Sequence, residues 1–164
     1  MVFSSTSASV KPVSYMQRTR SYYKAQGFDK YYTWAKGEND FQHKLSKPLN
    51  DCRVTFVTTA VPDGRIPKMA RTASSQSIST MPDRFRTDEL SWDKEATHTD
   101  DRGSYVPLLP LLKLQDEGVI ASIANRYHFV PTEYSQSKTI DHDAPAILKA
   151  CLEDEVDIAI LIPL

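Results

Sequence analysis

Two short apolar runs stand out along the chain and predict buried strands. The first covers residues 53–60, RVTFVTTA, and the second covers residues 156–164, VDIAILIPL. Both are almost continuously apolar and rich in β-branched residues, which is typical of strands covered on both faces of a parallel sheet. Pro62, Asp63 and Gly64 follow the first run and predict the turn that ends it.

An aromatic-rich arm precedes the first strand. Residues 14–27 predict a helix in which Tyr15 and Tyr22 share one face, and Gly27 supplies the stop. An aromatic string of the kind that follows usually packs an arm onto a core or a partner, although it can also line a ligand pocket. The string consists of Phe28, Tyr31, Tyr32 and Trp34.

Two more helices are predicted in the second half of the chain. Residues 106–118 combine prolines suited to a first turn with leucines on one face, and Gly118 closes the helix. Residues 143–155 give the clearest helix, with Asp143 as its cap and Pro145 in its first turn. The leucines expected to face the core in the first helix are Leu108, Leu111, Leu112 and Leu114, and the apolar stripe of the second is Ile147, Leu148, Cys151 and Leu152.

The remaining segments of this half show weaker patterns. Residues 72–80 are polar and predict a loop, although Ile78 also fits a short strand. Residues 119–124 predict a short strand, and residues 125–137 predict a loop that contains aromatic residues.

Strand–helix–strand order with apolar strands predicts an α/β fold, a three-layer sandwich with a mainly parallel sheet. Ligands bind beyond the carboxyl ends of such strands, and sheet edges need cover. We therefore expect a fold that is incomplete as a single chain, with a second protein subunit completing the sheet and the active site. The predicted divisions are a flexible leader (1–12), an aromatic-rich helical arm (13–50) and an α/β domain (51–164).

Composition narrows the function classes. Of the 164 residues, 40% are hydrophobic and 25% charged, which is the range of a globular domain, and the net charge of −1 argues against nucleic-acid and membrane-surface binding. The longest apolar run is shorter than the roughly 20 residues that cross a bilayer. Cys52 and Cys151 are expected to be small buried residues rather than reactive thiols, and a reducing, cytoplasmic location fits their small number.

The densest group of chemically active side chains is Glu95, His98, Asp100 and Asp101. A histidine held by an aspartate can act as a general acid or base, so His98, Asp100 and Asp101 are the predicted catalytic residues. The same three side chains are the candidate ligands if a divalent metal is bound, although no cofactor is required. The alternative is a solvated loop whose side chains bind its own backbone.

Predicted substrate-binding residues lie elsewhere as well as in this loop. Thr58 and Thr59 end the first strand, where a parallel sheet places ligand-binding hydroxyls, although β-propensity alone explains them. His128 lies in an aromatic segment and either meets His98 or packs at the surface. The full predicted set is Thr58, Thr59, Glu95, His128 and Tyr134. No phosphate loop, CxxC, HExxH or GxSxG motif is present, and five glycines are too few for a dinucleotide fingerprint.

Taken together, these segments resemble the selenoprotein B family of glycine, betaine, sarcosine and D-proline reductases, in particular its cysteine-containing relatives without selenium. The matching segments are residues 15–35, 47–60, 90–101, 111–135 and 143–164. The resemblance implies reductive, thiol-based chemistry on small amino-acid-like substrates. It also implies a reactive cysteine or selenocysteine just after the strand at 156–164, in a loop that this sequence does not contain.

Three hypotheses follow. The first is a subunit of a reductase-like complex, in which His98 acts as acid or base and a partner supplies the thiolate. The second is a metal-dependent hydrolase or lyase subunit that uses His98, Asp100 and Asp101, with His128 as a further ligand. The third is a non-catalytic structural subunit that docks through its aromatic arm.

Overall fold

The structure is a computed structural model that describes residues 14–30, 44–62, 72–86, 95–96, 98–133 and 135–163. The chain divides between Asp40 and Phe41 into two compact units. The first unit contains helix α1 (Tyr15–Ala25), which confirms the predicted helix of the arm. The helix ends before Gly27, whose φ of +87° is a left-handed conformation that glycine adopts without strain. The predicted leader and Tyr31, Tyr32 and Trp34 lie outside the described residues.

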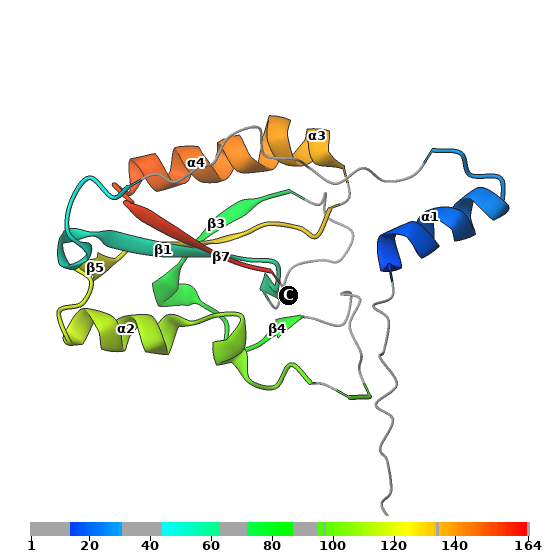
Figure 1. Ribbon diagram of the computed structural model, residues 1–164. Coiled ribbons are helices and arrows are strands. Elements are labelled where there is room, and N and C mark those ends of the chain that lie inside the picture. The colour runs from blue at the N-terminus through cyan, green and yellow to red at the C-terminus, as the bar shows by residue number, and fades with distance from the viewer. Residues whose placement is uncertain are drawn as a thin grey trace, which may run out of the picture. The chain divides into compact units, whose positions relative to one another are not determined.

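The second unit is built on a mainly parallel sheet (Figure 1). Strand β1 (Arg53–Thr58) pairs in parallel with β5 (Ser122–Ile123) and β6 (Arg126–Phe129) on one side and with β7 (Ile158–Ile162) on the other. β3 (Ser74–Ser77) runs antiparallel beside β6. The order across the sheet is therefore β3, β6, β1 and β7, with β5 leading into β6.

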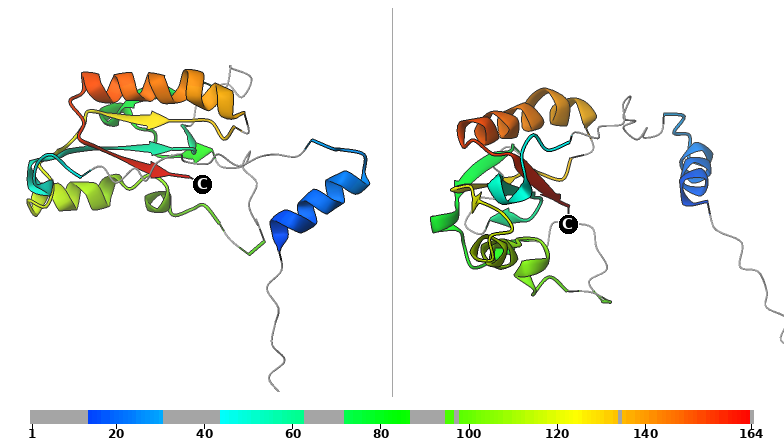
Figure 2. Two further views of the ribbon diagram at one scale, coloured as in Figure 1. Left: turned by 45° about the horizontal axis from the view of Figure 1, so that its top comes forward. Right: turned by 60° about the vertical axis from the view of Figure 1, so that its left-hand side comes forward.

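Helices cover both faces of this sheet and make a three-layer α/β sandwich, as predicted (Figures 1 and 2). α2 (Leu108–Asp116) lies on one face and α4 (Ala144–Glu153) lies on the other. We call these the α2 face and the α4 face. The shorter elements are η1 (Leu49–Asp51), β2 (Val61–Pro62), η2 (Ile78–Thr80), β4 (Phe85–Arg86), η3 (Arg102–Ser104), α3 (Gln136–Lys138) and the π-helical turn η4 (Thr139–Asp143).

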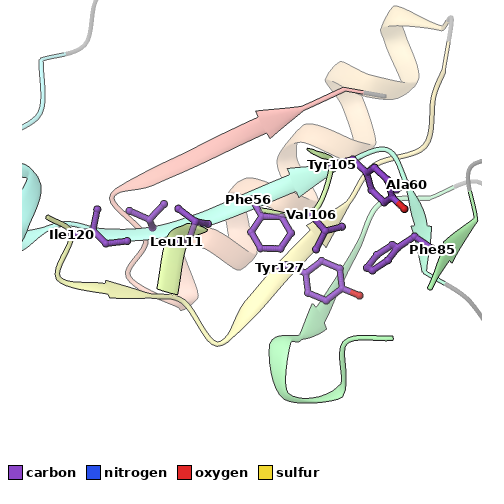
Figure 3. Packing of buried hydrophobic residues seen from close by; sticks show 9 residues of the cluster. Phe56, Ala60, Phe85, Tyr105, Val106, Leu111, Ile120 and Tyr127 are labelled. Carbon is purple, nitrogen blue, oxygen red and sulfur yellow. The ribbon is translucent and has the colours of Figure 1, made fainter. Parts of the chain in front are cut away.

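The main hydrophobic core lies on the α2 face. Phe56 of β1 stacks on Tyr127 of β6 with ring centroids 5.5 Å apart, and both residues are fully buried. Figure 3 shows how the core continues from this stack toward α2 at one end and toward β4 at the other. Its buried members are Val54, Phe56, Ala60, Phe85, Tyr105, Val106, Leu111, Ile120 and Tyr127.

Two predicted loops contain strands. Ser74–Ser77 forms β3 because its backbone pairs with β6, although its side chains are all polar. Arg126–Phe129 forms β6 and is buried from Tyr127 onward. Sequence pattern missed β6 because a histidine occupies its α4 face, and only the tertiary contacts of that side chain explain its burial.

The prediction that the last strand is covered on both faces is wrong. Ile158, Ile160 and Ile162 of β7 pack against the core on the α2 face. The residues between them point to the opposite face, and Leu161 is 73% exposed. Among the described residues, β7 pairs only with β1 and is an edge strand.

Helix α4 also departs from its prediction in two ways. Asp143 makes no capping hydrogen bond to the helix, because α3 and η4 lead directly into it; its Oδ1 instead accepts from the Ala73 backbone N–H at 2.9 Å. Leu148 and Leu152, predicted to be core residues, are 60% and 68% exposed. Leu112 of α2 is likewise exposed, whereas Leu111 is buried.

Candidate active site at the carboxyl edge of the sheet

The carboxyl ends of β1, β6 and β7 meet at one edge of the sheet. Thr58 lies there in register with Phe129 of β6 and Ile162 of β7. Its side chain is fully buried, and Oγ1 accepts from the Ala60 backbone N–H at 3.2 Å, so the hydroxyl shapes the turn after the strand. Thr59 is the next residue and is partly exposed. Of the two threonines, Thr59 is the one that a ligand can reach.

The loop predicted to be catalytic is highly exposed. Nδ1 of His98 lies 3.8 Å from Oδ2 of Asp100, and their side chains are 74% and 93% exposed. This distance is too long for a hydrogen bond, so the contact does not fix the histidine tautomer. Oδ1 of Asp101 accepts from the Gly103 backbone N–H at 2.9 Å and caps η3. The structure therefore brings Asp100 to His98, while Asp101 shapes the loop; Glu95 is exposed.

Tyr105 anchors this loop to the core. Its hydroxyl donates to the Thr99 carbonyl at 2.9 Å, and its buried ring lies edge-to-face with Phe85 at 6.2 Å. Figure 3 shows Tyr105, Phe85 and Ala60 together beyond the carboxyl end of β1. The His98 loop is thus attached at the same end of the sheet as Thr58 and Thr59.

His128 lies in a different environment, inside the interface between the sheet and α4. It is fully buried; Nδ1 lies 2.9 Å from Ser75 Oγ, and Nε2 lies 3.5 Å from Cys151 Sγ. Sequence reasoning missed this cluster because its three members come from β3, β6 and α4, and no local spacing connects them. The structure pairs His128 with Ser75 and Cys151, not with His98.

Burial sets the protonation of this cluster. Desolvation, assisted by the charge of Arg126, lowers the pKa of His128 below its ordinary value. Desolvation, assisted by the charge of Asp154, raises the pKa of the Cys151 thiol. Both groups are therefore favoured in their neutral forms at neutral pH, which suits a packed hydrogen-bonded pair and disfavours the nucleophilic thiolate.

Charged contacts dominate the opposite, amino edge of the sheet. Arg126 donates to Asp154 at 2.7 and 3.0 Å and to Glu153 at 3.0 Å, and the hydrogen bond from Arg126 lowers the pKa of Asp154. Nearby, Lys47 Nζ lies 2.8 Å from Asp157 Oδ2 at an open cavity of about 530 Å³. These pairs tie β6 to α4 and the segment before β1 to the start of β7, which is a structural role.

Several predictions lie beyond what this geometry reports. Tyr134 falls outside the described residues. Across the described part of the chain, no three histidine, cysteine, aspartate or glutamate side chains converge as a metal site would require. In the same part, no helix has the length and apolar character needed to span a bilayer.

The fold defines the class of this protein as a three-layer α/β protein. The polar side chains of Thr58, Thr59, His98 and Asp100 lie at the carboxyl edge of its mainly parallel sheet. Comparison of the chain with protein-family models, with curated proteins and with solved structures gives no match.

Proposed function

We propose that this chain is one subunit of a reductase-like enzyme complex that acts on a small amino-acid-like substrate, with the reactive thiol supplied by a second chain. The proposal combines the resemblance to the selenoprotein B reductases with the arrangement at the carboxyl edge. The second chain completes both the sheet and the active site. The proposed partners of this chain are the second subunit and a small-molecule substrate, and neither nucleic acid nor a membrane is involved. The proposed location of the complex is the cytoplasm.

The observation that carries the proposal is the position of the chain's own sulfur. Cys52 is fully buried at the start of β1, with Sγ 3.3 Å from the Pro48 carbonyl. Cys151 is a residue of α4 and is buried on the side of the helix that faces the sheet, and this burial raises the pKa of its thiol. Neither lies in the loops that follow the parallel strands, so thiol chemistry at the carboxyl edge requires sulfur from another source.

His98 and Asp100 are the groups proposed to handle protons at this edge. An exposed imidazole with a carboxylate at 3.8 Å can take up or release a proton, and a modest shift brings the two into hydrogen-bond contact. Asp101 is assigned a positioning role, because its carboxylate holds the Gly103 N–H. Thr59 and Glu95 are proposed to contact the substrate.

The test uses the complex purified from the cells in which the chain occurs. Reduction of glycine, betaine, sarcosine and D-proline is measured with a dithiol as electron donor. We expect His98→Ala to lower turnover by about 10²- to 10⁴-fold without changing assembly. The matched control is His142→Ala, which changes an exposed histidine on η4 and leaves turnover unchanged. Unaltered turnover in His98→Ala removes His98 from the mechanism.

A second arm locates the thiol. The complex is alkylated with iodoacetamide during turnover, and the modified peptides are identified by mass spectrometry. The expected result is that a cysteine of the second chain is modified as activity is lost, while Cys52 and Cys151 stay unmodified. Full activity of this chain alone, or inactivation by modification of Cys151, would overturn the proposal.

A further inference from the structure

Helices α1, α2 and α4 end in the same backbone motif. In each, two successive backbone N–H groups beyond the last turn donate back to carbonyls of that turn, which is a Schellman motif. The first donor of each motif adopts a left-handed conformation, so glycine is its usual occupant. The donor and acceptor residues are Gly27–Lys24 and Phe28–Tyr23 in α1, Gly118–Gln115 and Val119–Leu114 in α2, and Glu155–Leu152 and Val156–Cys151 in α4.

Helix α4 differs from the other two at the left-handed position. Gly27 and Gly118 have φ angles of +87° and +70°, whereas α4 places Glu155 there with a φ of +54°. Among the described residues, Glu155 is the one non-glycine residue with a positive φ. A side chain raises the energy of this conformation, so the fold by itself would favour glycine at position 155.

The contacts of the Glu155 side chain do not explain why glutamate occupies this position. The side chain is 86% exposed, and its Oε2 lies 4.0 Å from Nη1 of Arg53, which is too far for a hydrogen bond. An exposed ion pair at that distance contributes little to stability. Residues held in strained backbone conformations cluster at binding sites, so we look for a partner of Glu155 in the cavity beside it.

Glu155 and Arg53 both line the open cavity of about 530 Å³ at the amino edge of the sheet. The turn from α4 to β7 lies beside the start of β1, where the Asp157 backbone N–H donates to the Arg53 carbonyl at 2.9 Å (Figure 1). Lys47 and Asp157, which also line the cavity, already pair with each other at 2.8 Å. The charges left to meet a ligand are therefore those of Arg53 and Glu155, with the exposed Asp51 nearby.

Arg53 is held in place and still has donors to offer. Its Nε donates to Ser122 Oγ at 3.3 Å, and its Nη1 donates to the Asp154 carbonyl at 2.9 Å. Its Nη2 donates to no residue in the described part of the chain. A guanidinium oriented in this way is suited to bind a carboxylate, while the Glu155 carboxylate beside it is suited to accept from an ammonium group.

We propose that this cavity binds a small zwitterion of the α-amino-acid type, with its carboxylate on Arg53 and its ammonium group on Glu155. The two side chains lie only 4.0 Å apart, so a ligand that meets both carries its opposite charges close together. A segment with charges of one sign matches only one of the two; α1, for example, carries Arg18, Arg20 and Lys24 and no acidic side chain. The site lies at the opposite edge of the sheet from His98 and does not depend on the proposed function.

The test is an NMR titration of the full chain with L-alanine, which is not among the proposed reductase substrates. Propionate and ethylamine are the matched controls, because they lack the amino group and the carboxylate of alanine, respectively. We expect saturable shifts of the Arg53, Ser122 and Glu155 resonances with L-alanine, and none with either control at the same concentration. An equal response to propionate, or no saturable shift with L-alanine, would overturn the proposal.

Two substitutions at position 155 separate charge from strain. Glu155→Gln keeps the strain and removes the charge, so it should weaken L-alanine binding about 10- to 100-fold at an unchanged thermal midpoint. Glu155→Gly should weaken binding as much and raise the thermal midpoint by about 2–4 °C, because it relieves the strain.

The reciprocal control is Gly118→Glu, which places glutamate at the same position of α2. A Cβ at Gly118 meets no atom within 4 Å, so the substitution adds backbone strain without a clash. The thermal midpoint should fall by a similar amount, and L-alanine binding should not change. Unchanged affinity in Glu155→Gln, or a midpoint that does not rise in Glu155→Gly, would overturn the role assigned to Glu155 and with it the proposal.

Discussion

The aromatic stack at the centre of the sheet gives the sharpest test of the fold. Phe56 is fully buried, stacks on Tyr127 at 5.5 Å, and is in register with Ile160 of β7. Phe56→Ala removes a ring in contact with both neighbouring strands. Loss of a buried phenylalanine destabilises by about 3–5 kcal/mol, part of it from the cavity that remains and about 0.5–1.5 kcal/mol from the ring pair. The total free energy of unfolding of a typical domain is only about 5–15 kcal/mol, so this loss is a large part of it.

The assay is equilibrium unfolding in urea, followed by far-ultraviolet circular dichroism. Leu109→Ala is the matched control, because this exposed helix position is expected to change stability by less than about 0.5 kcal/mol. The free energies of unfolding are compared only if their dependence on urea concentration is the same in both proteins, because a change in that dependence reports a change in compactness. A loss below about 1.5 kcal/mol for Phe56→Ala would refute the placement of β1 and β6 side by side over a common core.

Two further predictions concern pH and the loop anchor. Burial lowers the pKa of His128 in the folded state, so below about pH 6.5 the unfolded chain binds a proton that the folded chain does not. Proton binding by the unfolded chain lowers the free energy of unfolding. The stability that neutral His128 contributes is therefore complete above about pH 6.5 and is lost as the pH falls toward the lowered pKa. The urea midpoint should therefore decrease as the pH is lowered from 7.5 to 5.5, and His128→Gln should make the midpoint depend less on pH. An identical pH dependence in the variant would contradict the assignment. Tyr105→Phe removes the hydrogen bond to the Thr99 carbonyl and should cost about 0.5–1.5 kcal/mol while increasing amide exchange in residues 98–101. Exchange that is unchanged in this loop would show that Tyr105 does not anchor it.

The parts of the fold that were predictable are those in which local pattern and tertiary environment agree. β1 is apolar almost throughout, and both of its faces are buried, so its sequence reports its position directly. α2 and α4 were recognised from apolar spacing and from prolines in the first turn, although Leu112, Leu148 and Leu152, which belong to that spacing, are exposed. β6 was missed because its histidine is buried only through partners that lie 53 and 23 residues away in the chain, Ser75 and Cys151.

The candidate site was predictable in composition but not in geometry. Sequence placed His98, Asp100 and Asp101 in one loop, but the choice between the two carboxylates depends on backbone conformation. The Asp101 carboxylate accepts a hydrogen bond from the Gly103 N–H, so Asp100 is the carboxylate that lies beside the histidine. In the same way, apolar character predicted β7, but its exposure depends on how far α4 extends across the sheet, which no residue of β7 encodes.

The exposure of His98 bears on how the proposed active site would work. In water, the high dielectric screens the attraction between an exposed imidazole and a carboxylate 3.8 Å away, so the contact between His98 and Asp100 is weak. A partner that covers the loop would exclude water and lower the effective dielectric, which strengthens the attraction between the two groups where hydrogen bonds offset their desolvation. On this argument, docking of the second chain does more than deliver the thiol: it also turns a solvated histidine into an effective acid or base. The chain alone would then be inactive even when supplied with free thiol, whereas activity with free dithiol and no partner would contradict it.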